Sequence, residues 1–439
     1  MSNQSTRRDF LRGAVMTSAG IWVADRSLAK GFQTPNEKIN FACIGVGGKG
    51  SSDTMEASRF GNIVALCDVD EKRLDEMAQR FPNAKKFTDY RKMLDTMGKE
   101  IDGVTVSTPD HSHAPAAAMA MHMGKHCFCQ KPLTHSLFEA HRLGEIAKKM
   151  KVQTQMGNQG TSGSGLRRTA AQLKAGIVGT VKEVHVWTNR PIWPQGGARP
   201  EQRTPPSNLD WELWLGPAAE RPFGDGYHPF AWRGWWDFGT GALGDMACHT
   251  VNMPFMGLDL LNPTSVEAES PGHNGDSYPN WSTIRYEFPA TQARPAITMY
   301  WYDGGKMPGK EILQVEKPTD SGSLIVGDKG VLYCPGDYGQ DGRIISGGVE
   351  VGEVKFTQSP GHFAELAHAI KGEGTPVSNF PGYAVPLTQS ILLGNLAVWH
   401  TRNGGKRKVE WDAKRLKAKG APELDAMIRP KYRKGYVLG

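Results

Sequence analysis

Three side chains have the types and the spacing that alcohol oxidation requires. Asp245 and His249 are four residues apart in a stretch of helical character, so both side chains project from one helix face. Lys131 follows an expected strand, in the run Gln130-Lys131-Pro132. An imidazole titrates near neutral pH and suits a general base, while a lysine ammonium stabilises alkoxide character. Asp245 can orient His249 or bind a neighbouring hydroxyl. Taken alone, the three residues also fit a solvated helix pair and a surface lysine.

A hydride acceptor needs a binding site, and the glycine turn at 45–50 predicts one for a dinucleotide. The turn joins an expected strand at 39–44 to a helix, and a second strand at 63–67 leads into Asp68. Such a turn allows close approach of a pyrophosphate, and the start of the helix attracts its negative charge. The expected cofactor-binding residues are Gly45, Gly47, Gly48, Gly50 and Asp68. The alternative is a structural βαβ unit without a ligand.

Asp68 also distinguishes between the two nicotinamide cofactors. A carboxylate at the end of the second strand accepts the ribose hydroxyls of NAD and repels the 2′-phosphate of NADP. Asp70 lies nearby and Arg73 offsets part of this charge. The sequence therefore predicts NAD rather than NADP.

The first part of the chain alternates strands and helices, as a parallel sheet requires. Further strands are expected at 101–107, 126–129 and 152–156, with helices between them. Repeated βα units predict a doubly wound parallel sheet, a Rossmann domain over residues 36–157. In such sheets the ligand lies beyond the carboxyl ends of the strands, where Gly45, Asp68, Thr108 and Gln130 stand.

A second α/β domain is expected over residues 158–405. Its predicted strands lie at 181–188, 265–269, 282–288, 296–302, 322–326 and 331–334, and its helices at 242–256, 363–371 and 385–402. These short segments predict an open, mostly antiparallel sheet. Residues 406–439 are expected to form an extended C-terminal arm.

The segment 189–240 is a long loop rich in Pro, Trp and Gly. A loop of this length inside a compact domain is usually functional or carries short elements of its own. Indole faces suit the apolar faces of sugar rings, and charged neighbours can bond the hydroxyls. The candidate substrate-binding residues are Arg190, Trp193, His228, Trp232, Arg233 and Trp235. The alternative is a hydrophobic anchor or a subunit contact.

The chain resembles the Gfo/Idh/MocA family of sugar and inositol oxidoreductases over nearly all of its mature length. The resemblance rests on the glycine turn, Thr108-Pro109 with His113 behind it, Gly124-Lys125-His126, Lys131-Pro132 and the Asp245-x-x-x-His249 helix. It implies a Rossmann domain followed by an α/β domain whose open sheet is often used for oligomerisation. It also implies that Lys131, Asp245 and His249 form the catalytic set beside the nicotinamide.

The resemblance further places Thr108, Pro109, His113, Gln130 and Lys131 around the cofactor. One departure is visible, because the family usually has Glu-Lys-Pro where this chain has Gln130. A neutral amide removes a charge beside Lys131, which leaves the role of position 130 open.

Two groups of residues raise the question of a metal site. Asp110, His111 and His113 are close in sequence, but at the mouth of a strand they fit better beside the cofactor, with His111 facing the substrate. Cys127 and Cys129 form a Cys-x-Cys pair, but no second pair has zinc spacing. We expect six buried free thiols and no metal. A metal held by the Asp-His run is the alternative.

The N-terminus has the form of an export signal. Arg7 and Arg8 precede Phe10-Leu11, and a short apolar run from 13 to 24 ends near Ser27-Leu28-Ala29. This pattern predicts a twin-arginine leader over residues 1–30 and a periplasmic protein; a lipid-interface helix is the alternative. The net charge of +7 comes partly from the two ends of the chain. The body has no basic stripe with interleaved aromatics, which argues against nucleic-acid binding.

Three functions fit these features. The first is an NAD-dependent oxidoreductase that takes hydride from a secondary hydroxyl of a sugar or polyol and holds its cofactor tightly. The second is a glycoside-cleaving enzyme with no net redox change, which oxidises the sugar, eliminates the substituent and returns the hydride. The third is a sugar-binding protein without chemistry, against which Lys131, Asp245 and His249 argue. The expected partners are the substrate, the export machinery during transit, and further copies in a dimer or tetramer.

Overall fold

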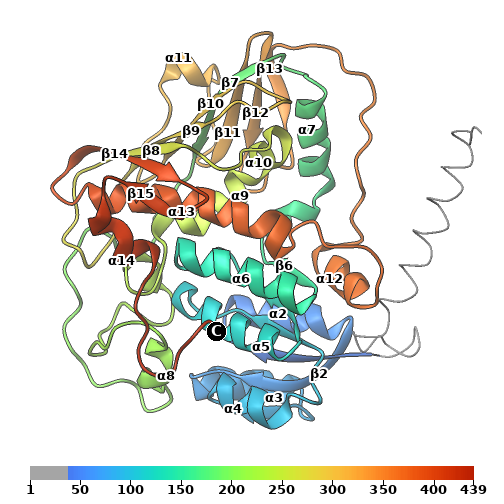
Figure 1. The fold of residues 1–439 in the computed structure, drawn as a ribbon, viewed down its shortest axis with the longest axis vertical. Helices are drawn as coiled ribbons and strands as arrows, with labels where there is room; N and C mark the ends of the chain where they lie inside the picture. Colours follow the sequence, from blue (N-terminus) through green and yellow to red (C-terminus); the bar gives the residue numbers. More distant parts are fainter. Residues whose placement is uncertain (1–37) are drawn as a thin grey trace, which may run out of the picture.

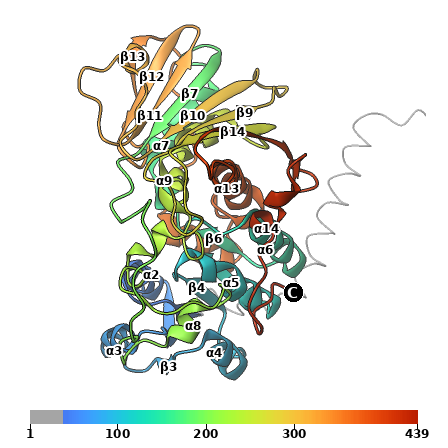
Figure 2. The same ribbon diagram turned by 90° about the vertical axis from the view of Figure 1, so that its left-hand side faces the viewer.

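The structure is a computed structural model that describes residues 38–439. The predicted export leader lies outside the described residues. Within the described residues, no helix is both long enough and apolar enough to cross a membrane. Figures 1 and 2 show two sheets, one at each end of the molecule, with a layer of helices between them.

The N-terminal domain is the predicted doubly wound parallel sheet. Its six strands follow the order β3-β2-β1-β4-β5-β6. The strands are β1 (Ile39–Ile44), β2 (Gly61–Cys67), β3 (Lys85–Phe87), β4 (Gly103–Val106), β5 (His126–Cys129) and β6 (Thr154–Met156). All five pairings are parallel, and the order reverses at β1 and β4, which is where such sheets bind ligands.

The helices of this domain cover both faces of the sheet. They are α2 (Lys49–Ser58), α3 (Glu71–Arg80), α4 (Tyr90–Met97), α5 (His113–His122) and α6 (Leu137–Met150). The face with α2 and α3 would leave Phe128 of β5 bare, and α12 (His362–Ile370) covers it from far along the chain. Phe363 packs against Phe41 and Phe128, with ring centroids 5.8 and 4.8 Å apart. The second domain therefore completes the core of the first.

The C-terminal domain is built on a nine-stranded sheet of order β13-β12-β11-β7-β10-β9-β8-β14-β15. Its strands are β7 (Val181–Trp187), β8 (Ser265–Ser270), β9 (Thr283–Phe288), β10 (Ile297–Tyr302), β11 (Gly322–Gly327), β12 (Gly330–Pro335), β13 (Arg343–Gly347), β14 (Gly405–Asp412) and β15 (Lys417–Lys419). Only β7 and β10 pair in parallel, so the prediction of an open, mostly antiparallel sheet is confirmed.

Helices on one face of this sheet face the Rossmann domain. They are α7 (Ser164–Lys174), α9 (Gly241–Thr250), α10 (Asn252–Leu258) and α13 (Val385–His400). Figure 2 shows α9 and α13 between the large sheet and α6. Alternate residues of β10 point to this layer: Ile297, Met299 and Trp301 are buried, whereas Thr298, Tyr300 and Tyr302 are half-exposed on the other face. The helix α9, which carries Asp245 and His249, thus stands at the domain junction.

Three connections differ from simple loops or arms. The long segment 189–240 contains α8 (Trp211–Leu215) and a short turn of helix at Ala231–Gly234 around an aromatic core of its own. The short helix α11 (Lys310–Leu313) lies beside the large sheet. The predicted C-terminal arm contributes β14 and β15 to the sheet, then α14 (Asp425–Ile428), and returns to the Rossmann domain.

Candidate active site

A positive φ and a close backbone contact require glycine in the tight turn between β1 and α2. Gly45 has a φ of +76°, which favours glycine. A Cβ on Gly50 would lie 1.8 Å from the carbonyl oxygen of Gly45, so no side chain fits there. A Cβ on Gly47 would meet only the flexible side chain of Arg73. Gly50 therefore serves the packing of α2 on β1, and Gly47 faces the open side of the turn.

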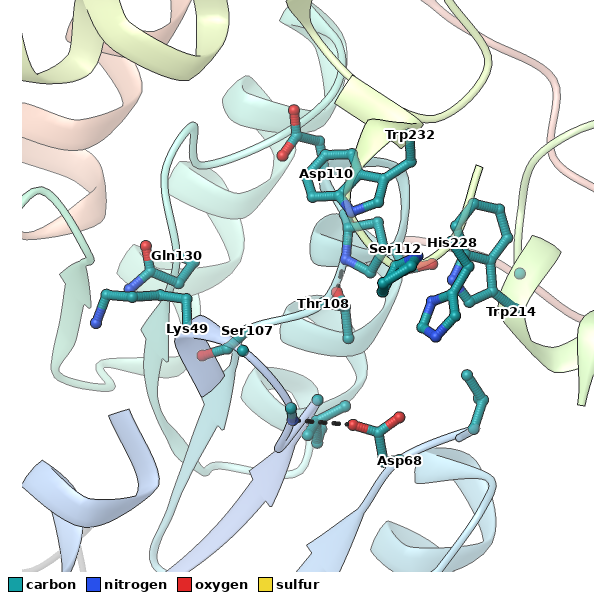
Figure 3. A pocket seen from close by; sticks show the side chains of 18 of the residues that line it. Lys49, Asp68, Ser107, Thr108, Asp110, Ser112, Gln130, Trp214, His228 and Trp232 are labelled. Carbon is teal, nitrogen blue, oxygen red and sulfur yellow. Dashed lines mark hydrogen bonds between the residues drawn. The ribbon is translucent and has the colours of Figure 1, made fainter. Parts of the chain in front are cut away.

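Asp68 holds this turn in place from the end of β2. Its Oδ2 accepts hydrogen bonds from the N–H groups of Val46 at 2.8 Å and Gly47 at 3.2 Å, and its Oδ1 accepts one from Asp70 at 3.0 Å. Burial raises the pKa of the Asp68 carboxyl, and these N–H groups oppose that rise. Asp68, the residue predicted to bind the cofactor ribose, is thus hydrogen-bonded to the backbone of the glycine turn (Figure 3).

A cavity of about 390 Å³ follows the carboxyl ends of the strands. The predicted site residues that line it are Gly45, Gly47, Gly48, Asp68, Thr108, Pro109, Gln130, Lys131, His228, Trp232, Arg233 and Asp245. In Figure 3 Asp68 and His228 lie on one side of the view and Gln130 on the other. The cavity therefore joins the glycine turn to the residues expected to do chemistry.

Lys131 and Asp245 meet across the two domains. The Lys131 Nζ lies 3.0 Å from Oδ1 of Asp245 and 2.6 Å from its backbone carbonyl oxygen. Arg233 donates from Nε to the same Oδ1 at 3.1 Å. Burial alone would raise the pKa of Asp245, but the charges and hydrogen bonds of Lys131 and Arg233 lower it to about 2. Asp245 is therefore an anion that holds two cations at the cavity wall.

His249 lies one turn further along α9 and does not line this cavity. Its ring is buried, stands edge-on to Tyr338, and has an Nδ1 without a hydrogen-bond partner among the described residues. Burial, reinforced by the charge of Lys131, lowers the pKa of His249 to about 3. The imidazole is therefore neutral at physiological pH and keeps a free polar atom.

Gln130 belongs to a buried polar network with α2. Its Nε2 donates to Oδ2 of Asp53 at 2.8 Å, and the Ser107 hydroxyl donates to the same oxygen at 2.8 Å. Lys49, the first residue of α2, pairs with the other oxygen of Asp53. The backbone N–H of Lys131 donates to Oε1 of Gln130 at 3.2 Å, so this network fixes the main chain beside the lysine.

Several predicted site residues lie away from the cavity lining. His113 is buried with its two ring nitrogens 2.9 and 2.8 Å from the carbonyl oxygens of Pro132 and Thr108, so it ties the ends of β4 and β5 together. His111 bridges the carbonyl oxygens of Trp214 and Phe238 in the same manner. Trp235 packs in the aromatic core of segment 189–240.

Arg190 and Trp193 also stand outside the cavity lining. Arg190 bonds the side chain of Asn189, its neighbour in sequence. The indole Nε1 of Trp193 donates to Gln195 at 2.9 Å, and its ring stands edge-on to Phe230. Trp232 and Arg233 do line the cavity; Arg233 bonds Asp245, the partner of Lys131, and its guanidinium lies 4.3 Å from the Trp232 ring centroid.

His228 contacts the cofactor end of the cavity rather than the catalytic end. Its Nε2 lies 2.9 Å from Oδ2 of Asp70, and the side-chain amide of Asn208 donates to Oδ1 of Asp70 at 2.7 Å. Asp70 also caps α3 by accepting from Lys72. The loop 189–240 is therefore fastened to the Rossmann domain beside Asp68.

Sequence reasoning missed several cavity residues, among them Trp214 and Tyr436, whereas Asp110, which it placed beside the cofactor, does line the cavity. Asp110 is buried and accepts a hydrogen bond from Thr240 at 2.6 Å, and burial raises its pKa. The approach of Trp214 and Tyr436 depends on contacts between distant segments, for which the sequence carries no periodic signal. Among the described residues no cluster has the ligands for a metal ion, and all six cysteines are buried thiols.

The cavity fits a dinucleotide. No side chain caps α2, and Gly48 and Lys49 at its start line the cavity, so this end of the helix can face an anion. The indole Nε1 of Trp214 is buried at the cavity without a partner among the described residues and is a ready donor. Asp68 and the glycine turn would hold the adenosine and pyrophosphate, and Gln130 and Lys131 would flank the nicotinamide half.

Together, the doubly wound sheet, its glycine turn and the facing helix with Asp245 define a dinucleotide-dependent oxidoreductase fold. Residues 39–158 match the NAD-binding Rossmann fold of the Gfo/Idh/MocA oxidoreductase family, and residues 171–294 match the C-terminal alpha/beta domain of the same family. The chain belongs to the Gfo/Idh/MocA family and has an NAD-binding Rossmann domain.

The curated relatives are distant. A glycosyl hydrolase family 109 protein from Shewanella pealeana is 28% identical over 34% of this chain and 38% of its own length. The myo-inositol 2-dehydrogenase of Thermotoga maritima is 31% identical over 25% of this chain and 34% of its own length. The chain thus aligns with well under half the length of these relatives.

Solved structures extend the likeness of fold over most of the chain. The WlbA dehydrogenase from Chromobacterium violaceum, in complex with NADH and UDP-GlcNAcA, has a TM-score of 0.62 at 18% identity, covering 86% of this chain and 98% of its own. An inositol dehydrogenase homologue from Azotobacter vinelandii, complexed with NADH and myo-inositol, has a TM-score of 0.55 at 15% identity, covering 86% and 98%. At these identities the likeness shows the fold alone.

Proposed function

We propose that this protein is an NAD-dependent enzyme that oxidises a secondary hydroxyl of a sugar or polyol by hydride transfer and retains its cofactor. The observation that carries the proposal is the placement of Lys131 Nζ 3.0 Å from Asp245, in one cavity with the glycine turn. A charged donor at the nicotinamide end of a dinucleotide site is the arrangement that alcohol oxidation needs.

Lys131 and Asp245 have distinct roles in this proposal. The bound NAD supplies the hydride acceptor. The ammonium of Lys131 donates to the substrate oxygen and stabilises negative charge on it as the C–H bond breaks. Asp245, held anionic by a pKa of about 2, keeps that ammonium oriented. Arg233 shares Asp245 and thereby stabilises the same geometry.

His249, one turn from Asp245 on α9 and outside the cavity lining, is the proposed acceptor of the hydroxyl proton, which requires the substrate to reach past Asp245. Its imidazole is neutral and its Nδ1 is free of protein partners in the described residues, so it can accept a hydrogen bond. The depressed pKa makes it a weak base while the site is empty of negative charge. An alkoxide beside it favours the protonated ring by Coulomb attraction.

Trp232 and Arg233 favour a carbohydrate over an apolar alcohol. The indole offers a flat apolar surface, and the guanidinium, which lies over that ring, offers donors to hydroxyl groups. Both line the cavity with Lys131. The named substrates of the relatives and neighbours, myo-inositol and sugar derivatives, agree with this class.

The second candidate function is glycoside cleavage without net redox change, and the Shewanella relatives favour it. NAD, held by the glycine turn, would supply the acceptor for the hydride of the sugar C–H, and a base would take the hydroxyl proton, which gives a ketone. The ketone acidifies the neighbouring C–H, a base takes that proton, and the aglycone leaves with the C–O electron pair. A proton neutralises the departing aglycone and water adds to the resulting alkene. Return of the hydride to the ketone carbon, with a proton to its oxygen, would restore the hydroxyl and leave no net redox change.

One experiment separates the two functions. Protein purified with its cofactor is incubated with chromogenic glycosides and, separately, with polyols, in the absence of added NAD. Aglycone release over many turnovers with unchanged cofactor absorbance supports cleavage. A single stoichiometric reduction of bound NAD, continued only with a carbonyl acceptor, supports net oxidation. Neither signal with any sugar, polyol or glycoside would refute the proposed enzyme.

We further propose export to the periplasm and assembly into a homo-oligomer. The paired Arg7 and Arg8 of the leader support export, and enrichment of the protein in the periplasmic fraction tests it. The outer face of the large sheet supports assembly, because Tyr300 and Tyr302 are half-exposed there. Light scattering of wild type and Tyr300→Lys tests the second point.

A further inference from the structure

The residues after α14 return to the Rossmann domain and contact three of its helices. Tyr432 bonds Glu139 of α6. The guanidinium of Arg91, on α4, lies 4.6 Å from the ring centroid of Tyr436. His122, on α5, donates to the carbonyl oxygen of Leu438 at 2.9 Å. Figure 1 shows this segment running from α14 past α8 to the helices of the first domain.

Arg433 joins this segment to α8. Its backbone N–H donates to Pro217 at 3.1 Å and its Nε to the carbonyl oxygen of Gly216 at 3.0 Å. Its Nη1 and Nη2 bond the side chain and the backbone carbonyl oxygen of Glu212, both at 2.8 Å. The Glu212 side chain is 68% exposed, so its ion pair adds little, and the bonds to backbone oxygens dominate.

The two joined segments line the same end of the cofactor cavity. Trp214 and Gly216 come from α8 and the residue after it, and Tyr436 comes from the C-terminal segment. They share this end with Asp68 and Tyr90 of the Rossmann domain. Asp68 marks the ribose next to adenine, so this is the adenosine half of the site. Trp214 and Tyr436 are 3% and 8% exposed, so both rings are packed into the walls of this end.

We propose that residues 432–438, fastened to α8 by Arg433, form a C-terminal latch over the adenosine half of the NAD site. This inference rests on the proposed NAD-dependent function. Before NAD can leave through the adenosine end, the contacts of the latch with α8 or with Arg91 must break. Trp214 adds a direct contact, since its unpartnered Nε1 donates to an acceptor of the bound dinucleotide. The latch makes NAD a resident group rather than an exchanging cosubstrate.

Release of NAD from the full-length protein tests the latch. Protein is loaded with NADH, freed of excess by gel filtration, and mixed with excess NAD⁺ while NADH fluorescence is followed. We expect Arg433→Ala and Tyr436→Ala to raise the release rate constant at least about tenfold, since the first removes three side-chain hydrogen bonds and the second removes the ring that lines the cavity and contacts Arg91. Trp214→Phe keeps the ring and loses the donor, and about a fivefold increase is expected.

Two matched variants control for effects of charge and folding. Lys434→Ala changes an exposed cation beside Arg433 and should release NADH at the wild-type rate. Glu212→Gln removes only an exposed charge and should stay within about twofold. Wild-type release rates in both Arg433→Ala and Tyr436→Ala would overturn the latch. If Arg433→Ala melts below the assay temperature, Tyr436→Ala decides alone.

Failure of the latch is distinguishable from failure of the proposed function. Wild-type protein that binds NADH but exchanges it as fast as the variants remains an NAD-dependent enzyme without a latch. Wild-type protein that takes up no NADH in equilibrium dialysis refutes the function and the latch together.

Discussion

Gln130 donates its side-chain amide to the carboxylate of Asp53, with Nε2 and Oδ2 2.8 Å apart. Asp53 is only 2% exposed, and it also accepts from Ser107 and pairs with Lys49. Family members usually carry a carboxylate before the Lys-Pro pair. In this chain Asp53 of α2 supplies a carboxylate at that place instead. This explains the amide at position 130, because a second carboxylate at that distance would repel the first.

The first prediction concerns this pair. Gln130→Glu places two carboxylates within hydrogen-bond distance in a buried site, so we expect a loss of about 2 kcal/mol in the free energy of unfolding and weaker NAD binding. Chemical denaturation and equilibrium dialysis measure the two effects. The double variant Gln130→Glu/Asp53→Asn restores one carboxylate and one amide and should recover most of the loss. If the double variant were no more stable than Gln130→Glu and bound NAD no more tightly, Asp53 would not be the carboxylate that replaces the one at position 130.

The second prediction separates two glycines of one turn. Gly50→Ala drives a Cβ against the backbone of Gly45, so the domain should lose about 3 kcal/mol or more of stability. Gly47→Ala meets only the movable Arg73 side chain, so the protein should fold with a melting temperature near that of the wild type but bind NAD at least about tenfold more weakly. Thermal melting and NAD titration together check both. Equal loss of stability in the two variants would contradict this division.

The Rossmann half of the protein was predictable because its signals are local. Repeated βα units gave the sheet, and the glycine turn and Asp68 fall at its carboxyl edge, where the cavity lies. Lys131 and Asp245 are far apart in sequence, and their direct contact follows from the domain junction. Their association was inferred from family resemblance rather than from spacing.

The rest depended on packing between distant segments. His228 and Trp235 were grouped with Trp232 by sequence, but a compact loop points neighbours in different directions: His228 reaches Asp70 and Trp235 joins the aromatic core. Tyr436 enters the cavity because the chain, after β14, β15 and α14, returns to the Rossmann domain. No periodicity in the sequence encodes such contacts.

The third prediction is a loss of stability on mild acidification. Burial lowers the pKa values of four histidines: to about 3 for His249, and to about 4 for His111, His126 and His362. In the unfolded chain these rings bind protons near pH 6.5. As the pH falls from about 6.5 to 4, the unfolded state therefore binds more protons than the folded state. Each of these rings then lowers the free energy of unfolding by up to about 1.4 kcal/mol per pH unit.

Asp245 does not contribute to this fall. Its folded pKa of about 2 lies below the unfolded value, so its contribution is complete above about pH 4 and is lost only as the pH falls through 2. Urea denaturation at pH 7 and pH 5 measures the slope. His249→Gln should flatten it, whereas His141→Gln, at a partly exposed position on α6, should leave it unchanged. A slope unaffected by His249→Gln would show that this ring is not buried as a neutral group.

The fourth prediction tests the division of labour between Lys131 and His249. Lys131→Met removes the donor to the substrate oxygen and should lower the rate of hydride transfer about 10²–10³-fold, the usual cost of losing such a donor. It also leaves Asp245 paired with Arg233 alone, so NADH binding should change little. His249→Gln removes the base, and its rate should recover partly as the pH is raised, because hydroxide or water then takes the proton. Single-turnover absorbance of bound cofactor gives the rates, and NADH fluorescence titration serves as the control. If Lys131→Met transferred hydride at the wild-type rate, Lys131 would have no part in the mechanism, and its place in the cavity would serve binding alone.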